Sequence, residues 1–107
     1  MVNSEIKNIV IKFANVLMNK GISVEKAILF GSYLSSKYSN YSDIDIAIVS
    51  PDFGKDRFEE GKVLLQTAWR VDPRIEPIPI SSKSYNHDTW VPLIYEIRHH
   101  GLEIKAA

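Results

Sequence analysis

Residues 42–50 have the sequence SDIDIAIVS and narrow the choice of fold more than any other segment of the chain. Isoleucine, alanine and valine dominate this run, and Pro51 ends it. A short apolar run bounded by polar residues and a proline is typical of a buried β-strand. A buried strand needs other strands beside it and helices against it, so we expect a layered α/β structure.

Helical and extended patterns alternate along the rest of the chain. Apolar residues recur at helical spacing between Ser4, which can cap a helix, and Gly21, which can end it. The segment KAILF at 26–30 predicts a short buried strand, and the polar residues 33–42 predict a turn-rich loop. After a loop at 51–56, a helix is expected up to about Val71, with an apolar stripe formed by Phe58, Leu64, Leu65, Ala68 and Trp69.

The C-terminal third continues this alternation. Residues 74–80, RIEPIPI, must be extended, because two prolines two positions apart do not fit a helix and belong on a sheet edge. A last helix is expected to begin near Asp88 or Thr89, to carry Pro92 in its first turn and to end at Gly101. Its predicted buried residues are Trp90, Leu93, Ile94 and Ile97.

These elements together predict the fold class. The segment LEIK at 102–105 alternates in polarity and is expected to add a short closing strand. The sum is an α/β fold of the α+β type, a small mixed β-sheet packed with helices. The length of 107 residues fits one domain, so residues 1–107 are expected to form a single domain.

Composition limits the kinds of partner. Lys plus Arg and Asp plus Glu both number 13, so no net charge attracts nucleic acid or an anionic membrane. The absence of cysteine excludes disulfides, thiolate metal sites and a cysteine nucleophile. Glu5, Lys7 and Lys12 interrupt the apolar N-terminal segment, which therefore predicts neither a signal peptide nor a membrane span. We expect a soluble cytoplasmic protein, with nucleic acid an improbable ligand.

Two carboxylates stand at the start of the 42–50 strand. Side chains alternate along a strand, so Asp43 and Asp45 share one face with Cα atoms about 7 Å apart. Two full charges at that separation repel by roughly 2 kcal/mol at an effective dielectric constant near 20. A magnesium ion would relieve this repulsion, because Mg²⁺ prefers oxygen ligands and uses one or two carboxylates together with substrate phosphates. The alternative is that both aspartates simply face water at a strand end.

A third carboxylate, Glu76, lies in the proline-rich strand. If that strand pairs beside the first, three acids on two strands make room for two metal ions. Glu76 could instead be an edge-strand charge that discourages aggregation. Asp72 is a competing candidate, but it falls in a turn before Pro73, and a strand holds geometry better than a turn.

Gly31 and Ser32 are candidates for phosphate binding. They leave a strand and enter a possible helix, where backbone N–H groups and the serine hydroxyl can face an anion. A P-loop is excluded, because it requires Gly, Lys and Ser or Thr at 36–38, whereas the chain has Ser36, Lys37 and Tyr38. A Gly-Ser pair alone also occurs in ordinary turns.

The combination of these motifs resembles a known family. LFGS at 29–32, ten intervening residues, DID at 43–45 and a later strand glutamate are similar to the motif of the DNA polymerase β-like nucleotidyltransferases, in particular the minimal nucleotidyltransferase domains. The resemblance implies the polymerase β-like fold. It also implies that Gly31 and Ser32 bind the nucleotide phosphates, that Asp43 and Asp45 bind magnesium, and that Glu76 completes the catalytic and metal site.

The resemblance has departures. Many relatives carry a basic residue and then a glycine just past the Gly-Ser turn, where this chain has Ser35 and Ser36. Lys37 is the candidate to take over the contact with the triphosphate. If it does not, the nucleotide has fewer positive contacts than is usual in the family. The two prolines after Glu76 could also tilt its strand.

The resemblance further implies a reaction and a partner. The reaction is Mg²⁺-dependent transfer of a nucleotidyl group, AMP if ATP is the donor, to an acceptor hydroxyl. Small members of the family resemble antitoxins that act with a HEPN-type helical partner, so a partner protein of that kind or a homo-oligomer is expected. The alternative is a non-catalytic module that binds nucleotide or docks on its partner. Antibiotic-type small-molecule modification would need an acceptor pocket that a chain this short is not expected to supply.

Several other polar and aromatic residues are assigned structural roles. His99 and His100 sit near a helix end where cations favour the dipole, and His87 is expected in a loop. Trp69 and Trp90 are expected in the core. The tyrosines at 33, 38 and 41 either stack on a base, shape the phosphate loop or meet a partner.

Overall fold

The computed structural model describes residues 4–34 and 42–105. Within them, β1 (Lys26–Phe30), β2 (Ile44–Ser50), β3 (Ile75–Ser81) and β4 (Leu102–Glu103) form one four-stranded sheet. The strand order is β3-β2-β1-β4, with β1 antiparallel to both β2 and β4 and β2 parallel to β3. The mixed sheet with helices confirms the predicted fold class, including the edge position of β3 and the closing strand β4.

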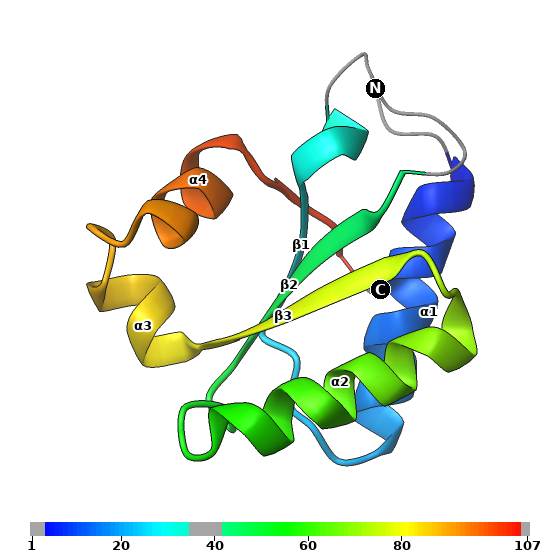
Figure 1. Ribbon diagram of the computed structural model, residues 1–107, viewed down its shortest axis with the longest axis horizontal. Helices are drawn as coiled ribbons and strands as arrows, with labels where there is room; N and C mark the ends of the chain where they lie inside the picture. The colour runs from blue at the N-terminus through cyan, green and yellow to red at the C-terminus, as the bar shows by residue number, and fades with distance from the viewer. Residues whose placement is uncertain (1–3, 35–41, 106–107) are drawn as a thin grey trace.

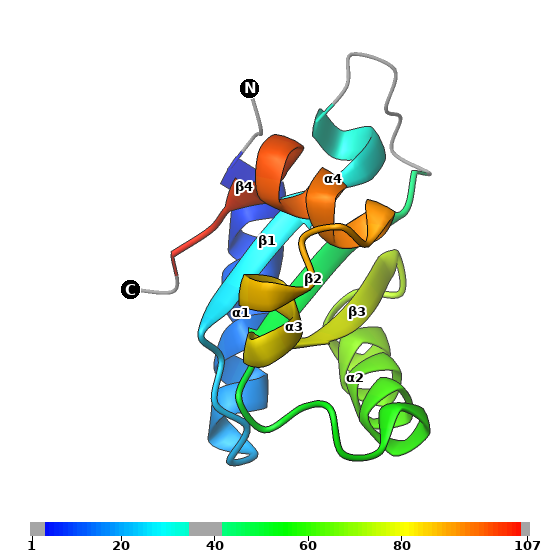
Figure 2. The same ribbon diagram turned by 90° about the vertical axis from the view of Figure 1, so that its left-hand side faces the viewer.

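Helices cover both faces of the sheet. Helices α1 (Ser4–Asn19) and α2 (Arg57–Val71) lie on one side, and α3 (Ser82–His87) and α4 (Pro92–His100) lie on the other (Figure 1). Figure 2 shows α3 and α4 in front of the sheet, with α1 behind it. The short 3-10 helix η1 (Gly31–Leu34) follows β1 directly.

Strand β2 supplies apolar side chains to both layers. Ile44, Ile46 and Ile48 belong to the apolar cluster that contains the buried residues of α1 and α2. Ala47 and Val49 belong to a second cluster with residues of α4. Because side chains alternate along a strand, Asp45 shares the face of Ala47 and Val49, beside α3 and α4. The burial of both faces explains the continuous apolar run that the sequence shows.

The outer edge of β3 is shaped by its two prolines. The Ile44 N–H donates to the Arg74 carbonyl at 2.8 Å, which starts the parallel ladder between β2 and β3. In such a ladder the backbone groups that face the neighbour come from every second residue, here 74, 76, 78 and 80. Pro77 and Pro79 therefore direct their backbone away from β2, where a missing N–H breaks no bond within the sheet.

The predicted burial of three aromatic residues is wrong. Phe58, Trp69 and Trp90 are 80%, 58% and 80% exposed, respectively. The buried residues of α2 are Leu64, Thr67 and Ala68, so its core stripe excludes Phe58 and Trp69. Trp90 precedes α4, which begins at Pro92 and not at Asp88 or Thr89. Leu93 is also 41% exposed, whereas Ile94 and Ile97 are buried as predicted.

Helix α3 was not predicted from the sequence. It is six residues long, has no buried residue, and begins where the Ser81 side chain accepts a hydrogen bond from the Ser84 N–H. His87 is consequently the last residue of a helix rather than part of a loop. Helix α4 ends as predicted, with Gly101 as its C-cap.

Candidate active site

The candidate residues meet where three strands come together at one end of the sheet. Asp45 is the register partner of Phe30 in β1 and of Glu76 in β3. Gly31 and Ser32 follow Phe30 directly, and Asp43 immediately precedes β2. The structure thus brings together five of the predicted site residues, Gly31, Ser32, Asp43, Asp45 and Glu76.

Asp45 lies at the centre of this group. Directly paired residues on neighbouring strands point to the same face, so the Asp45 and Glu76 side chains are neighbours. Burial raises the pKa of the Asp45 carboxyl, and the negative charges of Asp43 and then Glu76 raise it further. The three carboxylates are therefore close enough for their charges to interact, and the surroundings of Asp45 oppose its ionisation.

This donor set fits a magnesium ion in its chemistry. All three groups are carboxylates, the oxygen ligands that Mg²⁺ prefers, and a bound cation would offset the field at Asp45. Within residues 4–34 and 42–105, no three or more His, Cys, Asp or Glu side chains form a group ready to hold a metal. Mg²⁺ commonly takes only one or two protein carboxylates and completes its shell with water and substrate phosphate.

Gly31 is required by the close approach of its backbone to Asp45. Its φ is +77°, in the left-handed region that other residues rarely adopt. A Cβ at this position would overlap the Asp45 Oδ2 atom. The Ser32 hydroxyl donates a hydrogen bond to the Asp43 carbonyl oxygen at 3.4 Å. The Gly-Ser turn therefore lies directly against the paired aspartates.

Arg74 forms hydrogen bonds with three segments next to the site, a role that the sequence did not reveal. Its Nη2 donates to Asp72 Oδ2 at 2.9 Å and to Glu5 Oε1 at 3.2 Å, and its Nη1 donates to the Tyr33 hydroxyl at 3.4 Å. Tyr33 is buried in η1. Through these bonds, the turn before β3 is joined to the Gly-Ser turn and to α1. The lone Arg74 carries no motif, and only the folded chain brings its partners together.

The same contacts remove Asp72 from the list of candidate catalytic acids. Its carboxylate accepts hydrogen bonds from the Arg74 backbone N–H at 2.9 Å and from the Arg74 Nε at 3.1 Å. Asp72 is thus a partner of Arg74 in the turn, as its position before Pro73 suggested. Lys37, the remaining predicted nucleotide contact, lies outside the described residues, as do Ser35, Ser36, Tyr38 and Tyr41.

Replacing Asp72 with Asn is expected to lower the free energy of unfolding by about 2 kcal/mol at pH 7, because a charged hydrogen-bond pair is lost. The side-chain hydrogen bond from Arg74 lowers the pKa of Asp72. Its stabilisation is therefore complete above the pKa of an unfolded aspartate and is lost as pH falls through the lower folded value. Urea unfolding at pH 7 and at pH 3 measures the difference in stability between wild type and variant, which should shrink at the lower pH.

Glu5→Gln is the control, because the Glu5 side chain is 68% exposed and should contribute under about 1 kcal/mol. An equal loss in both variants would contradict the assignment.

The strand arrangement, the Gly-Ser turn and the three acids define a protein of the nucleotidyl-transfer class. The family model described as the nucleotidyltransferase domain matches residues 10–92, which is more than half of the chain. The chain belongs to this family of nucleotidyltransferase domains. Among curated proteins, none gives a significant match. In the part of the chain that the structure describes, no helix is both long and apolar enough to cross a membrane.

Proposed function

We propose that this chain, acting as one domain, catalyses Mg²⁺-dependent transfer of a nucleotidyl group from a nucleoside triphosphate to a hydroxyl of a partner protein. The donor in this proposal is ATP and the transferred group is AMP. The observation that carries it is the position of Asp45, which is paired with Glu76 on one side and in contact with the Gly31 turn on the other. Groups suited to phosphate, metal and acceptor thus lie side by side on adjoining strands.

Each residue has a role in this reaction. The backbone at Gly31 and the Ser32 hydroxyl hold the β- and γ-phosphates, and Lys37 adds a positive contact. Asp43, Asp45 and Glu76 are the residues that would hold up to two magnesium ions, which would supply neutralisation of phosphate charge and a lower pKa of the acceptor hydroxyl. The acceptor oxygen forms a bond to the α-phosphorus, the bond to the β-phosphate oxygen breaks, and pyrophosphate leaves. Glu76 receives the acceptor proton.

A second candidate function is binding without turnover. The resemblance to minimal nucleotidyltransferase domains implies an antitoxin that acts with a HEPN-type helical partner, and such a protein can act by docking alone. Two observations favour this candidate: residues 4–34 and 42–105 hold no ready three-acid metal group, and Ser35 and Ser36 replace the usual basic residue and glycine. The two candidate functions differ in whether the protein needs Asp43, Asp45 and Glu76 in order to act.

Glu76→Gln is expected to reduce nucleotidyl transfer by about 10²–10⁴, because the variant lacks the group that takes the acceptor proton. The measurement uses ATP labelled at the α-phosphate, Mg²⁺ and an extract of the source cells as the supply of acceptor. Label entering a protein band is compared for wild type and variant, and calorimetry follows the binding of Mg²⁺ and ATP. Glu25→Gln is the matched control, since Glu25 is an exposed acid just before the opposite end of β1. Absence of labelling by the wild type with every nucleotide would favour the docking function instead.

A further inference from the structure

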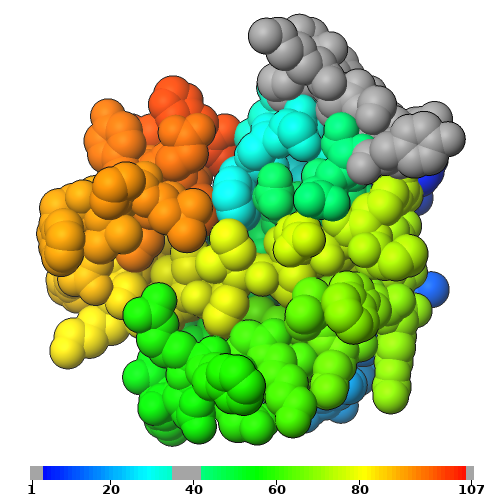
Figure 3. Space-filling model, viewed as in Figure 1, coloured from blue at the N-terminus to red at the C-terminus, as the bar shows by residue number. Residues whose placement is uncertain are grey.

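Large side chains form a line along the outer side of α2. Phe58, Lys62, Leu65 and Trp69 are spaced by four, three and four residues, a spacing that places them on one side of a helix. Phe58 is 80% exposed, Trp69 is 58% exposed and Leu65 is only partly buried. We call these four residues the α2 stripe. Figure 3 shows α2, in green, at the surface of the molecule below β3, in yellow. Aromatic side chains that gather on an exposed surface are typical of a surface that binds protein.

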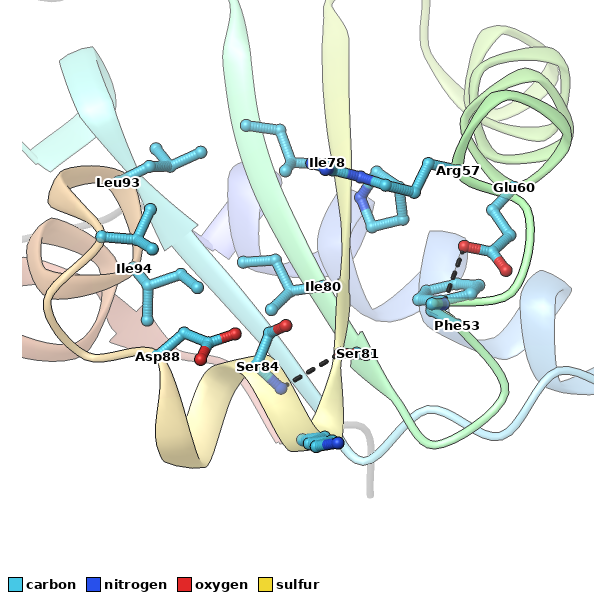
Figure 4. Close-up of a pocket in the computed structure, with 14 residues that line it drawn as sticks. Phe53, Arg57, Glu60, Ile78, Ile80, Ser81, Ser84, Asp88, Leu93 and Ile94 are labelled. Atoms are coloured by element: carbon cyan, nitrogen blue, oxygen red, sulfur yellow. Dashed lines mark hydrogen bonds between the residues drawn. The ribbon is translucent and has the colours of Figure 1, made fainter.

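The α2 stripe is distinct from the cleft beside β3. Arg57 and Glu60 extend from α2 towards that cleft (Figure 4). Among the described residues that line the cleft, none belongs to the α2 stripe. Glu60 already accepts hydrogen bonds from the N–H groups of three loop residues, 54–56. These two charged residues of α2 therefore belong to the cleft and not to the stripe.

Two opposite charges lie along the other border of the α2 stripe. Glu59 follows Phe58 and Arg70 follows Trp69, and successive residues of a helix turn by about 100°, so both charges lie on the same border. Both residues are exposed, and neither has an ion-pair partner in residues 4–34 and 42–105. They are separated by about 16 Å along the helix axis, too far to pair with each other. Each charge therefore remains available to another molecule.

A second copy of the chain supplies both complements when its α2 runs antiparallel. Phe58 and Trp69 lie at equal distances from the middle of the stripe, so a two-fold axis there brings Phe58 against the partner's Trp69. The same axis brings Glu59 towards the partner's Arg70, and each pair occurs twice. The α2 stripe is thus complementary to itself, both in its aromatic groups and in the charges along its border.

Gly61 gives an independent reason to expect a second helix at this position. It lies inside α2, three residues after Phe58, where glycine is less favourable than alanine because of its backbone entropy. A Cβ at Gly61 would meet no described atom within 4 Å, so packing within the described chain does not require a glycine. Side chains at the contact set the distance between packed helices, so a missing side chain allows a closer approach. A helix packed against the stripe would account for the glycine.

We propose that the α2 stripe is the interface of a symmetric, antiparallel homodimer. An aromatic side chain can bury about 150–250 Å², so at the observed exposures the aromatic residues of two copies supply roughly 600 Å². Leu65, the Lys62 stem and the border residues bring the contact to about 1,000 Å², near the lower limit for a specific interface. The net charge of +0 gives no overall repulsion between copies. This area predicts a reversible dimer with a dissociation constant in the micromolar range.

The proposed dimer does not depend on the proposed function. Helix α2 packs on one face of the sheet, whereas Asp45 lies on the face beside α3 and α4. Dimerisation through α2 therefore leaves both candidate active sites accessible. The dimer can be tested without any measurement of activity, so its failure and a failure of the transfer reaction are separate results.

Sedimentation equilibrium of the full chain tests the interface, at concentrations from about tenfold below to tenfold above the expected dissociation constant. The wild type should pass from monomer to dimer over this range. Glu59→Arg and Arg70→Glu each bring like charges together at both ends of the interface, so each should weaken association at least about tenfold. An equimolar mixture of these two variants should associate nearly as tightly as the wild type, because every charge pair in the mixed dimer again joins opposite charges.

Lys12→Glu and Glu96→Arg are the matched controls. They reverse an exposed cation of α1 and an exposed acid of α4, both outside the α2 stripe, and change the net charge by the same amounts. Both should associate like the wild type. Circular dichroism checks that every variant is folded.

Gly61→Ala is expected to change folding and association in opposite directions. In dilute solution, where the protein is monomeric, the variant should unfold at a higher urea concentration, because alanine favours the helix. Its dimer should dissociate about tenfold more readily, because the added methyl group separates the two helices. A variant that associates as tightly as the wild type would contradict the close approach at Gly61.

The remaining outcomes decide the proposal as a whole. A wild type that stays monomeric throughout the concentration range would overturn it. Two weakened charge variants that do not recover on mixing would exclude the antiparallel pairing. Dimers that are unaffected by the stripe variants, or that are weakened equally by the controls, would show that α2 does not form the interface.

Discussion

Asp45→Asn is expected to abolish nucleotidyl transfer while making the metal-free protein harder to unfold. Transfer should fall by about 10³ or more, because the central electrostatic contact of the site is removed. The burial of Asp45 and the nearby charges of Asp43 and Glu76 raise its pKa, so the ionised carboxylate opposes folding at neutral pH. A neutral amide removes this opposition, and the free energy of unfolding should rise by up to about 1 kcal/mol, because solvent screens part of the repulsion at this partly exposed group. Urea unfolding in a chelator and pyrophosphate release in Mg²⁺ measure the two effects.

Asp43→Asn provides the comparison for this variant. Asp43 is exposed, so its removal should cost a similar fraction of the activity with a smaller gain in stability. Added Mg²⁺ should stabilise the wild type more than either variant, because only the wild type keeps both aspartates. A metal-free Asp45→Asn protein that unfolds more easily than the wild type would contradict the argument from repulsion. Full pyrophosphate release by the variant would contradict the proposed role of Asp45.

Gly31→Ala is expected to lower the free energy of unfolding by about 3 kcal/mol or more and to remove most of the activity. An alanine at a φ of +77° costs about 1–2 kcal/mol, and its Cβ overlaps the Asp45 carboxylate. Either η1 or Asp45 must then move, and both belong to the candidate site. Thermal unfolding and calorimetric titration with Mg²⁺ and ATP measure the loss.

Gly21→Ala separates the two causes of that loss. Gly21 has a φ of +90°, but a Cβ there would meet no atom within 4 Å. We expect a loss of only about 1–2 kcal/mol at this position, with unchanged nucleotide binding. The difference between the two alanine variants measures the overlap with Asp45. Equal stability losses and equal nucleotide binding would show that the close contact at Gly31 is unimportant.

The main elements of the fold could be predicted from local patterns. The apolar run of β2, the paired prolines of β3 and the Pro92 and Gly101 signals of α4 each point to one conformation. Helix α3 could not be found in this way, because it buries no residue and so has no apolar periodicity. The exposure of Trp69 was missed because helical spacing does not say which of two neighbouring stripes faces the core. The exposure of Trp90 was missed because α4 begins only at Pro92, so Trp90 lies outside the helix.

The candidate site was partly predictable for a different reason. Alternation along a strand places Asp43 and Asp45 on one face whatever surrounds them. The pairing of Asp45 with Glu76 depends on the register between two strands separated by α2, which no local pattern determines. The contacts of Arg74 with Tyr33 and Glu5 depend in the same way on the folded chain. Sequence reasoning therefore identified the candidate acids Asp43, Asp45 and Glu76. It missed Arg74, whose hydrogen bonds join the segments beside them.

Pro77 and Pro79 also affect the self-association of the protein. An unpaired strand margin normally invites another chain to add a strand, the first step towards swapped dimers and fibrils. On β3, two of the outward-facing backbone positions have no hydrogen to donate, and the opposite margin is formed by a β4 of two residues. Growth of the sheet from one molecule to the next is thus blocked at the strand that carries Glu76, and that strand stays accessible to molecules other than its own copies.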